Sequence, residues 1–116
     1  MRFKNKIALV TGTSSGIGKK IVDQLIKEGC IVIATTRKKA PKKNLKKLEC
    51  YKIDVTSQSE WNTLSKHIKK KYKKLDILIN NAGVRISGDI NTTSLDLWNH
   101  IINTNLTSIF LGCKHC

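Results

Sequence analysis

The sequence has 116 residues, long enough for one small domain and too short for two, and its 40% hydrophobic and 26% charged residues are typical of folded proteins. No apolar run approaches the roughly 20 residues that cross a membrane, and the start of the chain lacks a signal-peptide core, so we expect a cytoplasmic protein without a membrane partner. The formal net charge of +14 at pH 7 suggests nucleic acid, but only Arg2, Arg37 and Arg85 of the 22 basic residues are arginines. Because arginine is the residue that suits base and phosphate contacts, we expect solvated lysine surfaces and no specific nucleic-acid partner.

Predicted strands and helices alternate along the first half of the chain. The continuous apolar run at residues 6–10 is typical of a parallel strand buried on both faces. Apolar residues at helical spacing from Ile17 to Ile26 predict a helix that ends before Gly29. A second buried strand is predicted over residues 30–35, and alternation predicts a third over residues 51–55.

The second half continues the alternation. Ser57 and Glu60 have the spacing of a capping box, which predicts the start of a helix with apolar residues on one face. A fourth strand is predicted over residues 75–80. Thr93, with Asp96 three residues later, predicts the start of a helix, and the apolar stretch at residues 106–116 predicts another. Strands separated by helices of this length indicate βαβ units, and therefore an α/β fold with a parallel sheet.

A glycine-rich turn lies between the first strand and the first helix, at residues 11–18 (TGTSSGIG). Gly12 allows the tight exit from the strand, Gly16 lets a pyrophosphate approach the backbone, and Gly18 lets the helix lie close to the sheet. Ser14 and Ser15 add hydroxyl donors, and the helix N-terminus favours negative charge. The alternative is a plain strand-to-helix turn, but the flanking elements favour a phosphate-binding turn.

This turn is similar to the TGxxxGxG fingerprint of the short-chain dehydrogenases/reductases, and four more landmarks of that family follow in order. They are residues 35–37 at the end of the second strand, 54–56 after the third, the NNAG segment at 80–83, and residues 103–106. The resemblance covers essentially the whole chain. It implies a Rossmann-like, doubly wound parallel sheet of about four strands in the order 3-2-1-4, forming one C-terminally incomplete NAD(P)-binding domain over residues 1–116.

The resemblance also implies a dinucleotide site. Members that prefer NAD carry an acid at the end of the second strand, whereas this chain has Thr36 followed by Arg37, so we expect NADP(H) rather than NAD. Lys38 and Lys39 would strengthen the local positive field, and Asp54 would accept a hydrogen bond from the adenine amino group. The alternatives are that Arg37 only begins a solvated loop and that Asp54 only begins a turn. The expected cofactor-binding residues are Gly12, Ser14, Ser15, Gly16, Ile17, Gly18, Arg37, Asp54, Val55, Asn81, Ala82 and Gly83.

Only one member of the family's catalytic tetrad has a match. Asn105 resembles the asparagine that positions a water in the proton relay, with Asn103 as the alternative assignment. The catalytic serine and the YxxxK pair are absent, because Tyr51 and Tyr72 are followed four residues later by Val55 and Asp76.

We therefore expect an NADP(H)-dependent carbonyl or alcohol oxidoreductase by descent that is inactive as this chain alone. Its expected partners are the dinucleotide and either a complementing C-terminal half or further copies of itself. The alternatives are a non-catalytic dinucleotide-binding or interaction module and a basic nucleic-acid-binding protein.

Four cysteines are present. Cys30 and Cys50 lie in apolar stretches, where a thiol acts as a small hydrophobe. Cys113 and Cys116 have the spacing of half a zinc site or a redox pair, but no second such pair completes four ligands. We interpret them as helical neighbours and expect no metal.

Overall fold

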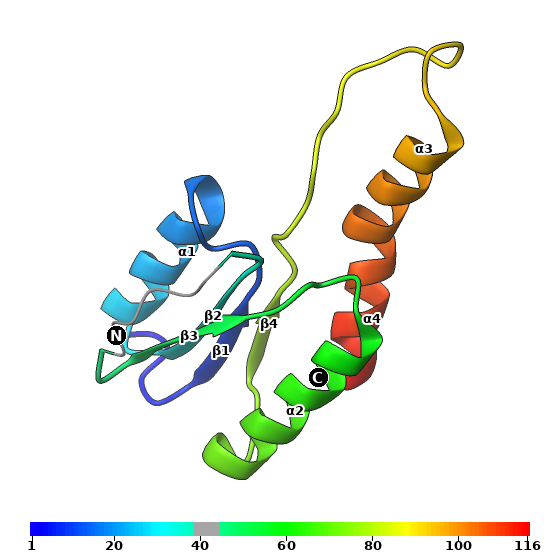
Figure 1. Ribbon diagram of the computed structural model, residues 1–116. Coiled ribbons are helices and arrows are strands. Elements are labelled where there is room, and N and C mark those ends of the chain that lie inside the picture. The colour runs from blue at the N-terminus through cyan, green and yellow to red at the C-terminus, as the bar shows by residue number, and fades with distance from the viewer. Residues whose placement is uncertain (39–44) are drawn as a thin grey trace.

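Four parallel strands form one sheet in the order β3-β2-β1-β4, which confirms the order expected from the resemblance (Figure 1). The computed structural model describes residues 1–38 and 45–116. Backbone pairing joins β1 to β2 through Ile7 and Ile31, and joins β1 to β4 through Ala8 and Ile77. The strands are β1 (Ile7–Val10), β2 (Ile31–Thr36), β3 (Leu48–Lys52) and β4 (Ile77–Ile79).

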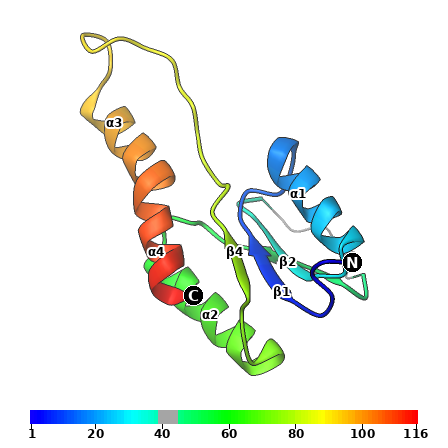
Figure 2. The ribbon, with the colours of Figure 1, turned by 180° about the vertical axis from the view of Figure 1, so that it is seen from behind.

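Helices cover both faces of the sheet. Helix α1 lies on one face, α2 and α4 lie on the other, and α3 extends beyond the sheet, as both views show (Figures 1 and 2). A π-helical turn over Asn103–Thr107 joins α3 to α4 without a break. The helices are α1 (Gly16–Lys27), α2 (Gln58–Tyr72), α3 (Leu95–Ile102) and α4 (Ser108–His115).

The core has two layers because neighbouring strand residues point to opposite faces. On the α2 side, Leu9 and Ile33 pack with Trp61 and Leu64. On the α1 side, Val10 and Val32 belong to the layer that α1 completes. The apolar face predicted for α2 is confirmed, since its Trp61, Leu64 and Ile68 are buried.

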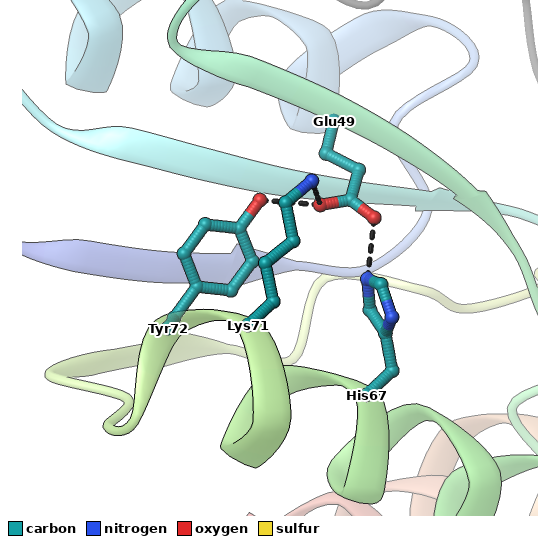
Figure 3. A network of polar contacts seen from close by, with 4 residues as sticks. All are labelled: Glu49, His67, Lys71 and Tyr72. Carbon is teal, nitrogen blue, oxygen red and sulfur yellow. Dashed lines mark hydrogen bonds and ion pairs between the residues drawn. The ribbon is translucent and has the colours of Figure 1, made fainter.

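The third strand lies earlier than the alternation at 51–55 predicted. It begins at Leu48, paired with Val32, and ends at Lys52. The sequence pattern missed Glu49, because a carboxylate inside a strand argues against burial. His67, Lys71 and Tyr72 from α2 converge on that carboxylate (Figure 3).

The Glu49 network ties the second half of α2 to β3. Lys71 Nζ donates to the carboxylate at 2.8 Å, His67 Nε2 lies 2.5 Å from its other oxygen, and the Tyr72 hydroxyl donates to it as well. Burial by itself raises the pKa of Glu49, but the hydrogen bonds from Lys71, Tyr72 and His67 outweigh burial, so the pKa lies below its ordinary value. Glu49 is therefore held as a carboxylate.

Two predicted helix caps differ in detail. Ser57 Oγ accepts the Glu60 N–H at 3.3 Å, as predicted. The second bond of the predicted capping box, from the Ser57 N–H to the Glu60 carboxylate, is wrong, because that carboxylate accepts the N–H of Asp54 (3.4 Å) instead. The cap of α3 is Ser94 rather than Thr93, since Ser94 Oγ accepts the Leu97 N–H at 3.1 Å. The Thr93 hydroxyl instead donates to the Asp89 carbonyl, so it stabilises the turn that precedes α3.

The C-terminal helices expose apolar surface. Leu95, Trp98, Leu106 and Phe110 are each more than half exposed, and β4 forms one edge of the sheet. Cys113 lies in α4 and Cys116 directly follows it, as expected for helical neighbours.

In the described residues all four cysteines are free thiols, and no cluster of histidine, cysteine or acidic side chains is placed to hold a metal. None of the helices in that part of the chain combines the length and apolar character that a membrane span requires.

Candidate functional site

A cleft of about 260 Å³ lies at the carboxyl ends of the strands, where ligands bind in open α/β sheets. Segments from the whole chain meet there: the glycine-rich turn, the ends of β2 and β3, the segment after β4, and α3 with the turn that follows it. The lining residues are Gly12, Ser14, Thr35, Thr36, Arg37, Ile53, Asp54, Val55, Thr56, Ala82, Gly83, Val84, His100 and Thr104.

The glycine-rich turn depends on backbone conformations that side chains disfavour. Gly12 has φ +67°, and a Cβ built on it would lie 2.8 Å from the Cα of Ala82. A Cβ on Gly18 would overlap the Gly12 carbonyl oxygen. Gly16 also has positive φ (+61°), but open space surrounds its Cβ position. Gly12 and Gly18 therefore permit close packing, while Gly16 leaves room above the helix N-terminus, as a phosphate-binding turn requires.

The N-terminus of α1 is free of side-chain capping. Ser15 occupies the N-cap position in an extended conformation, and its side chain makes no capping hydrogen bond. At the corresponding positions of α2 and α3, the Ser57 and Ser94 hydroxyls each accept a backbone N–H. The first turn of α1 therefore keeps donors and a positive dipole end for an anion, which fits a pyrophosphate.

Thr11 and Asn81 hold the turn in place. Thr11 Oγ1 accepts the backbone N–H groups of Asn81 (3.1 Å) and Ala82 (2.9 Å). The Asn81 amide donates to the carbonyls of Thr11 (3.1 Å) and Gly12 (2.9 Å). The structure thus places Asn81 behind the cleft as a brace, while Ala82 and Gly83 line it. Thr11 was missed by sequence reasoning, because its role depends on a segment 70 residues away.

Asp54 lies at the end of the cleft beyond β3. Its Oδ1 accepts the Thr56 hydroxyl at 2.6 Å and the Thr56 N–H at 2.9 Å. These two bonds hold the pKa of Asp54 below its ordinary value, and the nearby Arg37 guanidinium acts in the same direction. The buried indole of Trp61 donates to the Val55 carbonyl at 2.8 Å, which anchors the loop. Asp54 is therefore an ionised acceptor on a fixed loop.

The end of β2 supplies Thr35, Thr36 and Arg37. The Thr36 side chain is buried and donates to the Lys38 carbonyl at 2.7 Å, so it keeps the strand end in place. Arg37 is exposed and lines the cleft. Thr35 Oγ1 is buried without a hydrogen-bond partner in the described part of the chain. Lys39, expected to strengthen the positive field, lies outside the described residues.

Asn105 lies in the π-helical turn after α3. Its Nδ2 donates to the Val84 carbonyl at 2.8 Å, and its Oδ1 accepts the Val84 N–H at 2.7 Å. A Cβ on Gly83 would lie 3.2 Å from Asn105 Oδ1, so the small residue permits this approach. Asn105 therefore fixes the segment that leaves the NNAG motif, and is not itself among the cleft-lining residues.

The structure brings together seven of the residues expected from the sequence as cleft lining: Gly12, Ser14, Arg37, Asp54, Val55, Ala82 and Gly83. Ser15, Gly16, Ile17 and Gly18 form the cap and first turn of α1, directly after Ser14. The wall formed by Val84, His100 and Thr104 was not predicted from the sequence. Its one available signal was the four-residue spacing of His100 and Thr104, which places two polar residues on one helix face.

The comparisons with known proteins all point to the same family. The short chain dehydrogenase family model matches residues 6–116. The 3-oxoacyl-[acyl-carrier-protein] reductase FabG of Salmonella typhimurium is 36% identical over an alignment of 115 residues, which covers 95% of this chain and 47% of that protein. The chain thus spans about half the length of the curated relatives it matches.

Solved structures agree with the sequence comparison. The aldohexose dehydrogenase of Thermoplasma acidophilum superimposes with a TM-score of 0.89 at 32% identity, covering 97% of this chain and 43% of that one. A short chain dehydrogenase of Leptospira borgpetersenii with bound NAD+ superimposes with a TM-score of 0.90 at 25% identity, covering 98% and 45%.

Proposed function

This chain belongs to the short-chain dehydrogenase family, and we propose that it binds NADP(H) as the cofactor-binding half of a carbonyl or alcohol oxidoreductase. The observation that carries the proposal is the uncapped N-terminus of α1, which opens beside a cleft lined by Asp54 and Arg37. We also propose that residues 1–116 are one incomplete domain that works in the cytoplasm.

The pyrophosphate would bind at the start of α1. Gly16 leaves the backbone accessible, and the N–H groups of Ile17 and Gly18 belong to the first turn, where the helix dipole favours negative charge. The Ser14 and Ser15 hydroxyls are exposed and would add donors.

The adenosine would occupy the cleft between Asp54 and Ala82. The Asp54 carboxylate can only accept hydrogen bonds, which matches the amino group of adenine. Val55 and Gly83 would frame the ring, and Asn81 would support this wall through its bonds to the glycine-rich turn.

Arg37 is the residue on which the preference for NADP(H) rests. A guanidinium offers paired donors to a 2′-phosphate, and Thr36 takes the place of an acid that would repel it. The structure with bound NAD+ belongs to a relative, so the choice between the two dinucleotides depends on the residues of this chain.

When bound, the dinucleotide would supply the hydride chemistry. Asn105 resembles the relay asparagine, but its side chain is engaged with the Val84 backbone, so in this chain it positions the cleft wall. The sequence contains no YxxxK pair to hold and move a proton at the substrate oxygen. We therefore propose that turnover requires residues beyond these 116, supplied by a complementing half or by assembly over the exposed surface of α3 and α4.

Isothermal titration of the full chain with NADPH and NADH tests the proposal. We expect NADPH to bind more tightly, and Arg37→Ala to remove most of that difference. Arg85→Ala is the matched control, because Arg85 is also exposed but lies outside the cleft lining. Equal or tighter NADH binding would overturn the preference for NADP(H), and binding of neither nucleotide would overturn the proposed function.

A second candidate is a dinucleotide-binding module without catalysis, which the absence of YxxxK favours. Co-expression with the C-terminal half of a related reductase, carrying its serine and YxxxK, separates the two. Restored NADPH-dependent carbonyl reduction supports the oxidoreductase half. Dinucleotide binding without turnover in every such pairing supports the module.

A further inference from the structure

One wall of the cleft comes from a distant part of the chain. Val84, His100 and Thr104 line it. Val84 directly follows the NNAG segment, whereas His100 and Thr104 reach the cleft because the chain after β4 runs out beyond the sheet and α3 returns toward it (Figure 1). None of these three residues belongs to the glycine-rich turn, the strand ends or the NNAG segment. This wall therefore requires a separate explanation.

Within this wall, His100 is the side chain that can form directional hydrogen bonds from an exposed position. Thr104 lies one helical turn further along the same face and is buried, with only 8% of its surface exposed. Val84 is apolar and is fixed by Asn105 through both backbone groups. His100 is exposed, and its ring has no hydrogen-bond partner in the described part of the chain.

His100 shares the cleft with Asp54, and their hydrogen-bonding capacities are complementary. The carboxylate only accepts, whereas a histidine ring donates at least one N–H in either protonation state. Oδ1 of Asp54 is occupied by Thr56, and no group in the described part of the chain donates to Oδ2.

Adenine is complementary to this combination. Its amino group is a donor, and its ring nitrogens are acceptors. A carboxylate satisfies the amino group but cannot donate to the ring nitrogens, so these need a donor from another group in the cleft. Arg37 meets the other demand of the cofactor, a phosphate on the ribose, and lies at the end of β2 rather than on α3.

We propose that His100 is a further cofactor-binding residue. It donates a hydrogen bond to the adenine ring from the wall formed by Val84, His100 and Thr104. The assignment rests on the proposed function, because it adds a residue to the same site. It makes adenine recognition a property of two segments, the loop after β3 and helix α3. Recognition of the 2′-phosphate remains with Arg37.

Titration of the full chain and three variants tests the assignment. His100→Ala should bind NADPH about 3- to 10-fold more weakly, the range expected for one lost hydrogen bond. His100→Phe keeps a ring without an N–H and should show the same loss. His100→Gln keeps an N–H donor and should stay within about twofold of the parent chain. Asn99→Ala is the control, because Asn99 is the exposed neighbour on α3 outside the cleft lining.

A comparison of the two dinucleotides separates this role from that of Arg37. His100→Ala and His100→Phe should each weaken NADPH and NADH by the same factor, since both dinucleotides carry adenine, whereas Arg37→Ala should weaken NADPH alone. Unchanged binding by His100→Ala, or full binding by His100→Phe, overturns the assignment while leaving the proposed function standing. Failure of the parent chain to bind either dinucleotide overturns both.

Discussion

Helices α1 and α2 both have a serine at the N-cap position, but the two serines act differently. Ser57 caps α2 through its hydroxyl, and Glu60 ties the same turn to the backbone of Asp54. Ser15 occupies the N-cap of α1 without a capping bond, between two glycines of positive φ at 12 and 16. A helix end whose donors are satisfied internally is structural, whereas one whose donors stay free can bind an anion.

The largest expected effect comes from the glycines that hold the α1 turn. Gly12→Ala should destabilise the chain by about 2 to 4 kcal/mol, because a Cβ at positive φ would also press on the Ala82 backbone. Gly16→Ala has the same sign of φ but open space, so about 1 to 2 kcal/mol is expected. Urea unfolding of both variants measures the difference. Equal losses would mean that contact with Ala82 does not determine the conformation of the turn.

The two N-cap serines are expected to differ in what they stabilise. Ser57→Ala should lower the free energy of unfolding by about 1 kcal/mol, because it leaves the Glu60 N–H without its partner. Ser15→Ala should leave stability within about 0.5 kcal/mol of the parent chain, as expected for a residue without a stabilising contact, and should weaken NADPH binding instead. Unfolding and titration are measured on both variants. A comparable loss of stability from Ser15→Ala would contradict the distinction between the two helix ends.

The smallest effect concerns the other end of α2. Because the pKa of Glu49 is lowered in the fold, its carboxylate stabilises the fold above the ordinary pKa of about 4.5. That contribution is lost as the pH falls below this value through the lowered pKa. Glu49→Gln, which does not titrate, should therefore lose less stability than the parent chain between pH 6 and pH 3.5. Thermal melting across this range checks the sign, and parallel curves for the two proteins would count against it.

Local patterns predicted much of the fold. The apolar runs, the helical spacing along α1 and α2, and the glycines of the turn each depend on residues a few positions apart. Glu49 shows where such patterns fail. Its burial in β3 is permitted only because His67, Lys71 and Tyr72, about 20 residues later, neutralise and satisfy it. For this reason the predicted third strand began later in the sequence than β3 does.

The candidate site shows the same division. The residues Gly12, Arg37 and Asp54 lie directly after parallel strands, and the strand order alone brings their segments to one edge of the sheet. His100 lies in a helix whose approach to that edge depends on the path of the chain after β4, so its place in the cleft has no local signature. The role of Asn81 as a brace likewise depends on carbonyls 70 residues earlier.

The alternation of strands and helices, the glycine-rich turn, the family and the absence of a YxxxK pair from these residues can all be read from the sequence, because each is encoded by neighbouring residues. The tertiary structure was needed to show that Ser15 leaves its helix end uncapped while Ser57 caps one, and that His100 lines the same cleft as Asp54. Capping depends on side-chain orientation, and the cleft wall depends on contacts between distant segments. Local composition determines neither of them.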